Sequence, residues 1–336
     1  MARRANQLAQ RSSASLDVRV VFRDAPRPSV RPDLVYVFDA VPAEVVAALR
    51  LRVPLVLEAG DPIGSLLRNA GATRLRAAAH GLFEQAAWRV ADALVLRGEG
   101  FRDVIAERGL SRRVDVLPEG VDLSMFRPLP PGPGRERLGL RDGDVAVGVV
   151  GSIVWSPVER TTYGWELVEA LPRVDGRVKA VVVGEGTGLS KLRARAEELG
   201  VASRLITPGA VPHREVPELL AALDAASWTQ TPDDVGLSRT TLKLPEYLAC
   251  GTFVLASDVG EAGRAVDLNG ERVPYVGGRD ERYVNGIAAA IDAVAADPAA
   301  ARRRGLTGVA RARRYDWDRI AAGFVGVVER TLAAAR

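Results

Sequence analysis

The sequence predicts an α/β protein with two Rossmann-like domains, each built on a parallel sheet. Short β-branched runs alternate with helical patterns along nearly all of the 336 residues, as in right-handed βαβ units. The chain is also longer than the roughly 100–200 residues of one typical domain. The proline- and glycine-rich segment Pro128–Gly134 separates two such series and is the strongest linker signal. We therefore expect two domains that face each other across a cleft.

The strands are predicted from buried β-branched runs. The first series is Val18–Phe22, Leu34–Phe38, Val53–Leu57, Ala93–Leu96 and Val114–Leu117. The second series is Val145–Val150, Val178–Val183, Leu205–Thr207, Ala226–Trp228 and Phe253–Ala256. Ligands of such sheets bind beyond the carboxyl ends of the strands, so the loops after the strands are expected to carry the chemistry.

Three segments are expected along the chain. Residues 1–130 form a reduced N-terminal domain, 131–312 a second Rossmann-like domain, and 313–336 a C-terminal amphipathic helix. The N-terminal domain is called reduced because the chain begins near what would be its first helix, around residues 4–9. Either that domain lacks its first strand and loop, or the start codon is assigned late.

The composition excludes several classes of function. Only three of the 46 basic residues are lysines, only two histidines occur (His80 and His213), and Cys250 is the single cysteine. This argues against a disulfide framework, a metal site and metal chemistry. A net charge of +4 is too small and too dispersed for a nucleic-acid partner. No apolar run of about 20 residues and no secretory leader occurs, so a cytoplasmic protein is expected, with peripheral membrane contact left open.

The segment Thr240–Gly251 is the most informative motif. Pro245 is tolerated only in a first helical turn, so we expect a helix to begin near Leu242 with Thr240 or Thr241 as N-cap. Its backbone N–H groups would suit a diphosphate, Lys243 would add a positive charge, and Glu246 could accept hydrogen bonds from ribose hydroxyls. The alternative is an amphipathic helix on which Lys243 and Glu246 are merely solvated.

A resemblance extends this motif. LKLPEYLACGTFVLASDVG (242–260) resembles the donor-side signature of family 4 glycosyltransferases, which have the GT-B fold. Other segments match this family in order. These are Leu117–Asp122 with Phe126 and Pro128, Val183–Gly186, Pro208–Pro212 followed by Val216–Leu220 and Asp224, and Tyr315–Trp317. The similarity is firm over about residues 90–335, and Trp317–Leu332 matches the helix that crosses back to the first domain.

The resemblance implies transfer of a sugar from a nucleotide diphosphate, with UDP expected, to a hydroxyl acceptor, without a metal or cofactor and with retention of configuration. It assigns Glu246 to the ribose, the backbone N–H groups of Thr241 and Leu242 to the diphosphate, and the backbone at Val211 to the base. Gly151, Ser152 and Glu185 fall in the loops that contact the donor. Cationic side chains, Lys243 among them, would stabilise the leaving diphosphate. The acceptor is left open between a small natural product, a glycolipid and a polysaccharide precursor.

The sequence departs from the family at four positions. Gly60 replaces a histidine, Ser152 an arginine, Tyr163 a lysine and Ser238 a sugar-binding glutamate. Arg160 is a candidate for the missing cation, although a surface arginine is equally consistent.

Two carboxylate candidates have structural alternatives. Asp61 could orient an acceptor hydroxyl or act as a weak base, the alternative being an Asx-type turn before Pro62. Asp233 or Asp234 could replace the missing glutamate, unless both are solvated loop residues.

These departures leave two hypotheses, an active glycosyltransferase and a degenerate non-catalytic scaffold. Retention of Lys243 and Glu246 favours the enzyme. A dehydrogenase is rejected because Leu189 stands where a third glycine belongs after Gly184 and Gly186. Of the remaining reactive side chains, His80 is expected on a helix, His213 as a cap or surface residue, and Cys250 buried and inert.

Overall fold

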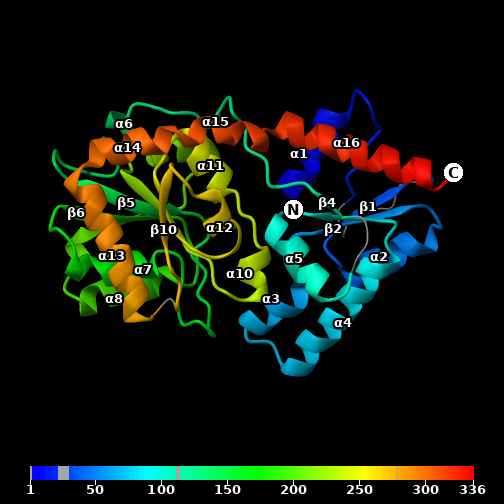
Figure 1. The fold of residues 1–336 in the computed structure, drawn as a ribbon, viewed down its shortest axis with the longest axis horizontal. Helices are drawn as coiled ribbons and strands as arrows, with labels where there is room; N and C mark the ends of the chain where they lie inside the picture. Colours follow the sequence, from blue (N-terminus) through cyan, green and yellow to red (C-terminus); the bar gives the residue numbers. More distant parts are fainter. Residues whose placement is uncertain (1, 22–29, 111–113, 278) are drawn as a thin grey trace. The chain divides into compact units, whose positions relative to one another are not determined.

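The computed structural model describes residues 2–21, 30–110, 114–277 and 279–336. The chain forms two compact units. Unit 1 comprises Met1–Gly120, Asp233–Thr240 and Arg314–Arg336, and unit 2 comprises Val121–Pro232 and Thr241–Arg313. Each unit contains one parallel sheet with helices on its faces (Figure 1). The predicted α/β class with two parallel sheets is confirmed.

The sheet of unit 1 has four strands in chain order. They are β1 (Val35–Phe38), β2 (Leu55–Ala59), β3 (Ala93–Leu96) and β4 (Val114–Val116). The predicted strand Val18–Phe22 is wrong over Val18–Val21, which form no strand, and Phe22 lies outside the described residues. Leu16 and Val18 pack instead against the apolar cluster that contains Trp317 and Phe324. The alternating apolar side chains of this segment therefore pack against a helix, and Val18–Val21 pair with none of the described strands.

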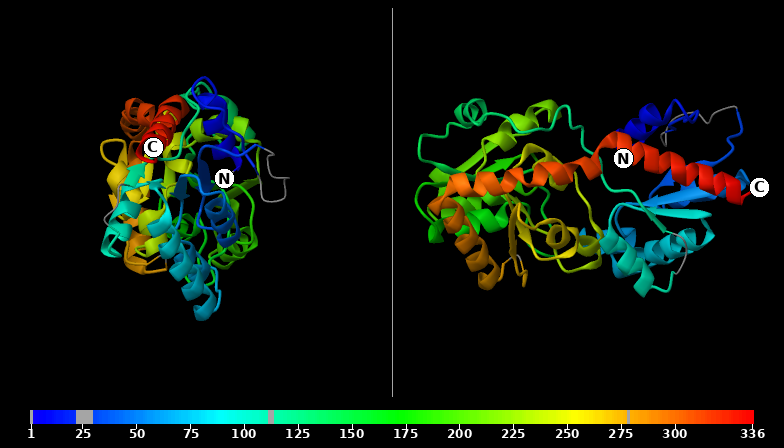
Figure 2. Two further views of the ribbon diagram at one scale, coloured as in Figure 1. Left: turned by 90° about the vertical axis from the view of Figure 1, so that its right-hand side faces the viewer. Right: turned by 45° about the horizontal axis from the view of Figure 1, so that its top comes forward.

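Helices cover both faces of this sheet. They are α1 (Ala2–Ser12), α2 (Pro42–Arg50), α3 (Ile63–Asn69), α4 (Arg74–Val90), α5 (Glu99–Glu107), α10 (Asp234–Ser238) and α16 (Trp317–Ala334). The last helix, α16, lies beside α1 on one face, and both pack on Val56 and Val95 of the sheet (Figure 2). Helices α2, α4 and α5 cover the opposite face around Trp88 and Phe101.

The sheet of unit 2 has six strands in the order β10-β9-β8-β5-β6-β7. They are β5 (Val145–Val150), β6 (Val178–Val183), β7 (Leu205–Gly209), β8 (Ala225–Trp228), β9 (Val254–Ser257) and β10 (Gly270–Val273). The order reverses between β5 and β8, so the carboxyl ends of these strands form the topological switch point at which ligands bind in such sheets. The edge strand β10 was not predicted, because two of its four residues are exposed and charged.

The helices of unit 2 surround this sheet. The α-helices are α6 (Gly132–Arg137), α7 (Trp165–Ala170), α8 (Leu189–Glu198), α9 (Val216–Ala221), α11 (Lys243–Cys250), α12 (Gly260–Ala265), α13 (Glu281–Ala296), α14 (Pro298–Leu306) and α15 (Gly308–Ala312). Short 3₁₀ turns are η1 (Leu171–Arg173), η2 (Ala202–Arg204) and η3 (His213–Glu215), and a fourth, η4 (Arg313–Tyr315), lies where the chain passes from unit 2 to unit 1. The segment Pro128–Gly134 lies within unit 2, which begins at Val121. No helix among the described residues has both the length and the hydropathy needed to cross a bilayer.

A buried carboxyl group joins α3 to α4. Glu84 is 1% exposed, and its Oε1 accepts a hydrogen bond from the backbone N–H of Ile63 at 2.9 Å, at the start of α3. Burial raises the pKa of Glu84 to about 7. In the unfolded chain the pKa of Glu84 is near its ordinary value of about 4.3. At a pH between these two pKa values, Glu84 therefore keeps its proton in the folded state and releases it in the unfolded state.

We therefore expect the free energy of unfolding to decrease as the pH rises from about 5 to about 8, because Glu84 must ionise in its buried position. The decrease is on the order of 3 kcal/mol. Glu84→Gln keeps an acceptor for Ile63 and removes the charge, so it should flatten this slope in urea titrations. Glu107→Gln, at an exposed position of α5, is the matched control and should behave as the wild type. Identical slopes for Glu84→Gln and the wild type would contradict the assignment.

Candidate functional site

The strongest candidate site lies in unit 2, beyond the carboxyl ends of β5 and β6. Backbone hydrogen bonds connect the loops that follow these strands: Gly151 N–H donates to the Val183 carbonyl and Ile153 N–H to the Glu185 carbonyl, both at 2.9 Å. The predicted residues Gly151, Ser152 and Glu185 therefore lie on adjoining loops. The side chains of Ser152 and Glu185 are exposed.

Helix α11 begins next to these loops. Its N-cap is Leu242, as the position of Pro245 predicted, and the Leu242 carbonyl accepts from Glu246 N–H at 3.1 Å. The prediction that Thr240 or Thr241 is the N-cap is wrong, because no side chain caps the helix. Both threonine hydroxyl groups are buried and lack a hydrogen-bond partner among the described residues.

Lys243 is buried at this helix start. The side chain is 8% exposed, and its Nζ lies 3.7 Å from the centroid of the Tyr163 ring. Glycine at position 151 leaves room for the ammonium group, because a Cβ there would lie 2.9 Å from Lys243 Nζ. The backbone φ of Gly151, 146°, also disfavours any other residue at this position. The alternative that Lys243 is merely solvated is thus wrong. Tyr163, which stands where the family has a lysine, provides an aromatic face for the one ammonium group.

No carboxylate of the described residues balances this buried charge. Within the described parts of the chain, no carboxylate lies within the 4 Å ion-pair distance of Lys243 Nζ. The backbone N–H groups of Thr241, Leu242, Lys243 and Leu244 also have no acceptor there. A buried ammonium beside unpaired N–H groups at a helix N-terminus is a site for an anion.

Glu246 follows one turn later on the same helix. It is 6% exposed, so the solvated alternative is wrong for it as well. Its Oε1 lies 2.6 Å from His213 Nε2, and the His213 ring packs against Phe126 with centroids 4.9 Å apart. His213 is thus half-buried and bound to Glu246, which corrects its prediction as a cap or surface residue. Val211, the residue assigned to the base, lies two positions before His213 on the same loop.

The structure does not bring Arg160 into this cluster. Arg160 is exposed with a φ of 53°, and its carbonyl accepts from Arg279 Nε at 2.9 Å. No contact among the described residues joins its side chain to Lys243 or Tyr163. It remains a prediction that Arg160 replaces the missing family cation.

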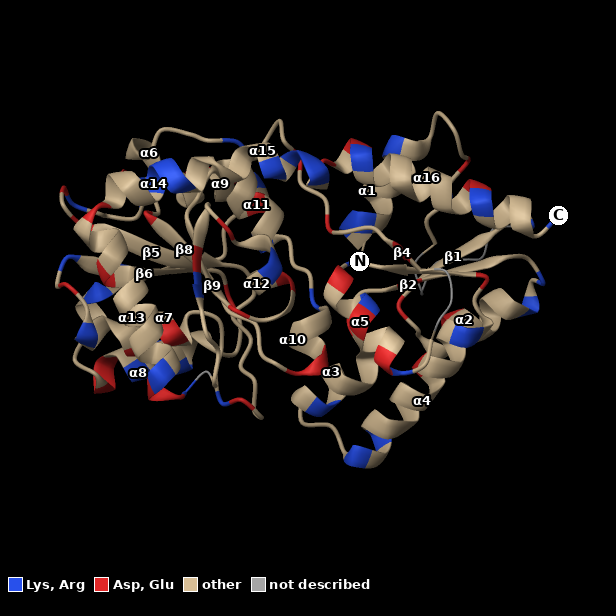
Figure 3. Ribbon diagram, viewed as in Figure 1, with Lys and Arg blue, Asp and Glu red and all other residues tan. Residues whose placement is uncertain are grey.

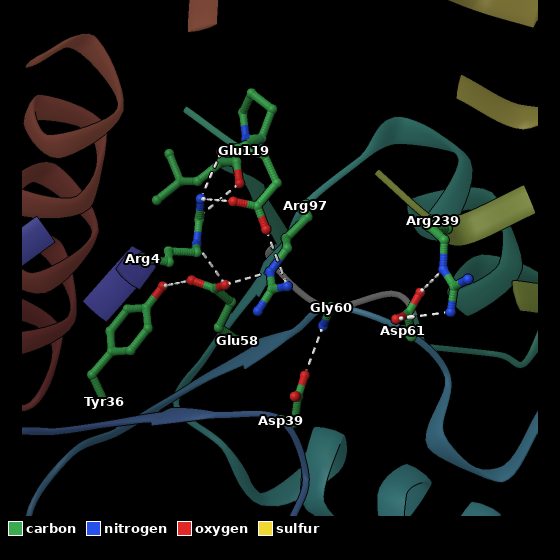
Figure 4. Close-up of polar contacts among 11 residues, drawn as sticks. Arg4, Tyr36, Asp39, Glu58, Gly60, Asp61, Arg97, Glu119 and Arg239 are labelled. Atoms are coloured by element: carbon green, nitrogen blue, oxygen red, sulfur yellow. Dashed lines mark hydrogen bonds and ion pairs between the residues drawn. The ribbon is translucent and has the colours of Figure 1, made fainter. Parts of the chain in front are cut away.

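A second polar cluster lies at the carboxyl edge of the unit 1 sheet (Figure 4). Glu58 of β2 is fully buried and accepts hydrogen bonds from Arg4 Nε at 2.8 Å, Arg97 Nε at 2.7 Å and Tyr36 Oη at 2.8 Å. Glu119 pairs with both arginines, at 3.7 Å and 3.2 Å. Burial alone would raise the pKa of Glu58, but Arg4 and Arg97 hold it below its ordinary value. The sequence analysis missed this cluster, although a glutamate within a buried strand was a visible signal.

Arg97 occupies the space beside Gly60, the position where the family often has a histidine. A Cβ at Gly60 would lie 2.7 Å from Arg97 Cζ, so a larger residue there would require a shift of the Arg97 guanidinium group, which is paired with Glu58. Gly60 N–H donates to Asp39 Oδ1 at 3.1 Å, and burial raises the pKa of Asp39. The backbone of Asp39 is strained, with a φ of 61°. The position of the missing histidine is therefore flanked by Arg97, which follows β3, and by the carboxyl group of Asp39, which follows β1.

The other predicted carboxylates in unit 1 have structural partners. Asp61 forms an ion pair with Arg239 at 3.0 Å (Figure 4), so its carboxylate is engaged within unit 1. Asp233 caps α10 through Gly236 N–H at 2.8 Å and also contacts Asn69.

Asp234 and Ser238 lie on the same short helix. Asp234 accepts from Ser65 Oγ at 2.8 Å and Arg108 at 2.6 Å. The alternative of solvated loop residues is thus wrong for Asp233 and Asp234, both of which are bound within unit 1. Ser238, at the position of the family's sugar-binding glutamate, is fully buried in α10.

Comparison with known proteins defines the class. The profile described as "Glycosyl transferases group 1" matches residues 145–297, which include most of unit 2 and the whole of α11. A GDP-mannose-dependent alpha-(1-6)-phosphatidylinositol monomannoside mannosyltransferase of Mycolicibacterium smegmatis is 30% identical over 73% of this chain and 67% of its own length. The chain belongs to the glycosyltransferase group 1 family.

Two further comparisons extend this result. D-inositol 3-phosphate glycosyltransferase of Segniliparus rotundus is 33% identical over 64% of this chain but only 46% of its own length. The chain spans about half the length of most of the curated relatives it matches. The structure of Anabaena HepE in complex with UDP and glucose superimposes with a TM-score of 0.71 at 21% identity, covering 88% of this chain and 77% of HepE. This likeness supports the confirmed fold class.

Proposed function

We propose that this protein is a glycosyltransferase that moves a sugar from a nucleotide diphosphate sugar to a hydroxyl acceptor with retention of configuration. The observation that carries the proposal is the buried ammonium of Lys243 at the start of α11, which has no carboxylate partner among the residues that the structure describes. A diphosphate supplies the missing charge. It also supplies acceptors for the unpaired N–H groups of Thr241 and Leu242.

The residues take distinct roles in this proposal. As the bond between the sugar C1 and the β-phosphate oxygen breaks, negative charge grows on the leaving diphosphate. Lys243 stabilises that charge, and Tyr163 keeps the ammonium in place. Glu246 accepts hydrogen bonds from the ribose hydroxyls, with His213 holding its carboxylate. The backbone at Val211 contacts the base.

The donor nucleotide is proposed to be UDP. HepE, which shares the fold, was crystallised with UDP, whereas the name of the mycobacterial relative specifies GDP-mannose. The names of the relatives also give inositol 3-phosphate and a phosphatidylinositol mannoside as acceptors. Both carry a ring of hydroxyl groups, which supports a polyol acceptor for this chain. The carboxyl edge of the unit 1 sheet, with Asp39 and Arg97, is its proposed binding surface.

The diphosphate site is tested by titration calorimetry with UDP, GDP and dTDP. We expect UDP to bind with a dissociation constant below millimolar. Tyr163→Leu should weaken UDP binding by about 2- to 30-fold, because a cation–π contact contributes about 0.5–2 kcal/mol. Tyr163→Phe keeps the ring and should bind like the wild type. Uridine, which lacks phosphate, should be insensitive to both substitutions. Failure of all three nucleotides to bind would remove the basis of the proposal.

Catalysis is tested by hydrolysis of UDP-glucose and GDP-mannose. Lys243→Ala should reduce the rate by about 100-fold or more, as expected when one group that stabilises the leaving charge is removed. Lys191→Ala is a matched control. The Lys191 side chain is exposed on α8, and its Nζ also faces an aromatic ring, 4.9 Å from the centroid of Trp155. Glu246→Ala should raise the KM for the donor. Background rates that stay unchanged in Lys243→Ala and Glu246→Ala would favour a non-catalytic scaffold.

A further inference from the structure

Helix α4 of unit 1 presents apolar side chains to the outside. Leu75, Ala79, Leu82, Ala86 and Val90 follow one another at spacings of three and four residues, and all five are exposed. Leu75 is 83% and Leu82 69% exposed, the two highest values among the large apolar side chains described. Residues at this spacing form one stripe along a helix. An apolar stripe normally faces the core, whereas this one faces outward.

The stripe is not needed to hold α4 in the fold. The opposite face of the helix already packs on the sheet through Ala87 and Trp88 and lies against Gly64 of α3 at Ala77, and all three of these α4 residues are buried. Phe83 adds to the same cluster. The outward leucines therefore contribute nothing that the described core requires.

The exposed charged residues of α4 itself have one sign. Arg74 and Arg76 in the first turn are exposed, and so is Arg89 in the last turn. The only acidic residue of α4, Glu84, is buried against α3. Figure 3 shows the arginine bands at the end of α4 where the α3–α4 connection turns. The outer surface of this helix is thus apolar along its centre and positive along its edges.

The position of these arginines is unfavourable for the helix itself. Cations in a first turn oppose the helix dipole, which favours acidic residues there. The first turn of α4 contains two arginines and no acidic residue. A partner that is negatively charged would compensate for this arrangement.

We infer that the exposed stripe of α4 docks on the surface of an anionic lipid bilayer. The stripe from Leu75 to Val90 is about 23 Å long at 1.5 Å per residue, so the helix can lie flat with its leucines among the acyl chains and its arginines at the phosphates. A second copy of this chain fits the stripe less well. A symmetric antiparallel pair would place Arg89 of one copy near Arg74 and Arg76 of the other. The inference does not depend on the proposed reaction.

The test is co-sedimentation of the full chain with vesicles of phosphatidylcholine alone and of phosphatidylcholine mixed with phosphatidylglycerol. We expect binding to the mixed vesicles, with at least a tenfold weaker partition for the double variant Leu75→Glu, Leu82→Glu. Arg74→Gln, Arg76→Gln should weaken binding several-fold and reduce its dependence on salt. Leu268→Glu is the matched control, because Leu268 of unit 2 is 68% exposed and should bind as the wild type does.

Three outcomes would overturn the inference. The first is a wild-type chain that does not sediment with the mixed vesicles. The second is a Leu75→Glu, Leu82→Glu variant that binds them as well as Leu268→Glu does. The third is a wild type that is dimeric in sedimentation velocity and becomes monomeric in the Leu75→Glu, Leu82→Glu variant, because the stripe would then be an interface between copies. Equal thermal unfolding of the variants shows that a loss of binding is not a loss of folding.

Discussion

The positive charge buried at the carboxyl ends of the strands is the constraint on which the candidate site depends. Unit 1 compensates its own charges, since Arg4 and Arg97 are both paired with Glu58 and Glu119. Removing one partner from such a buried set typically costs about 3–5 kcal/mol. In unit 2 the Lys243 ammonium is buried without a carboxylate partner among the described residues, and the Tyr163 ring faces it. One cluster is complete in itself, and the other is the proposed site for an anion.

This contrast explains the substitutions at family positions. The arginine and lysine expected beside the diphosphate are absent, and Tyr163 and Gly151 instead form a close-fitting place for one ammonium group. In unit 1 Gly60 stands at the position of the expected histidine, and the guanidinium group of Arg97 lies beside it. At Gly60 and at Tyr163, the departure from the family therefore comes with a close contact to a cationic side chain. These departures are compatible with a site in which other side chains take the roles of the residues that are usual in the family.

Much of the fold followed from local patterns. The buried strands β5 and β6 and the helix start at Leu242 were predicted, because β-branched runs and a first-turn proline are local signals. The false strand at Val18–Val21 and the missed β10 show the limit, since a strand forms only where a neighbour supplies hydrogen bonds. The His213–Glu246 contact joins residues 33 positions apart, and the partners of Asp61 and Asp234 lie more than 100 residues away. Such pairings depend on tertiary structure and have no local signature.

The most direct test of the central claim is a crystal structure of the protein with UDP. The account predicts that β-phosphate oxygens lie within about 3 Å of Lys243 Nζ and of the backbone N–H groups of Thr241 and Leu242. The Tyr163 ring should still face the ammonium group, and the ribose hydroxyls should reach Glu246. A diphosphate bound away from α11, with the Lys243 ammonium unchanged against Tyr163 and still without an anion, would contradict the account.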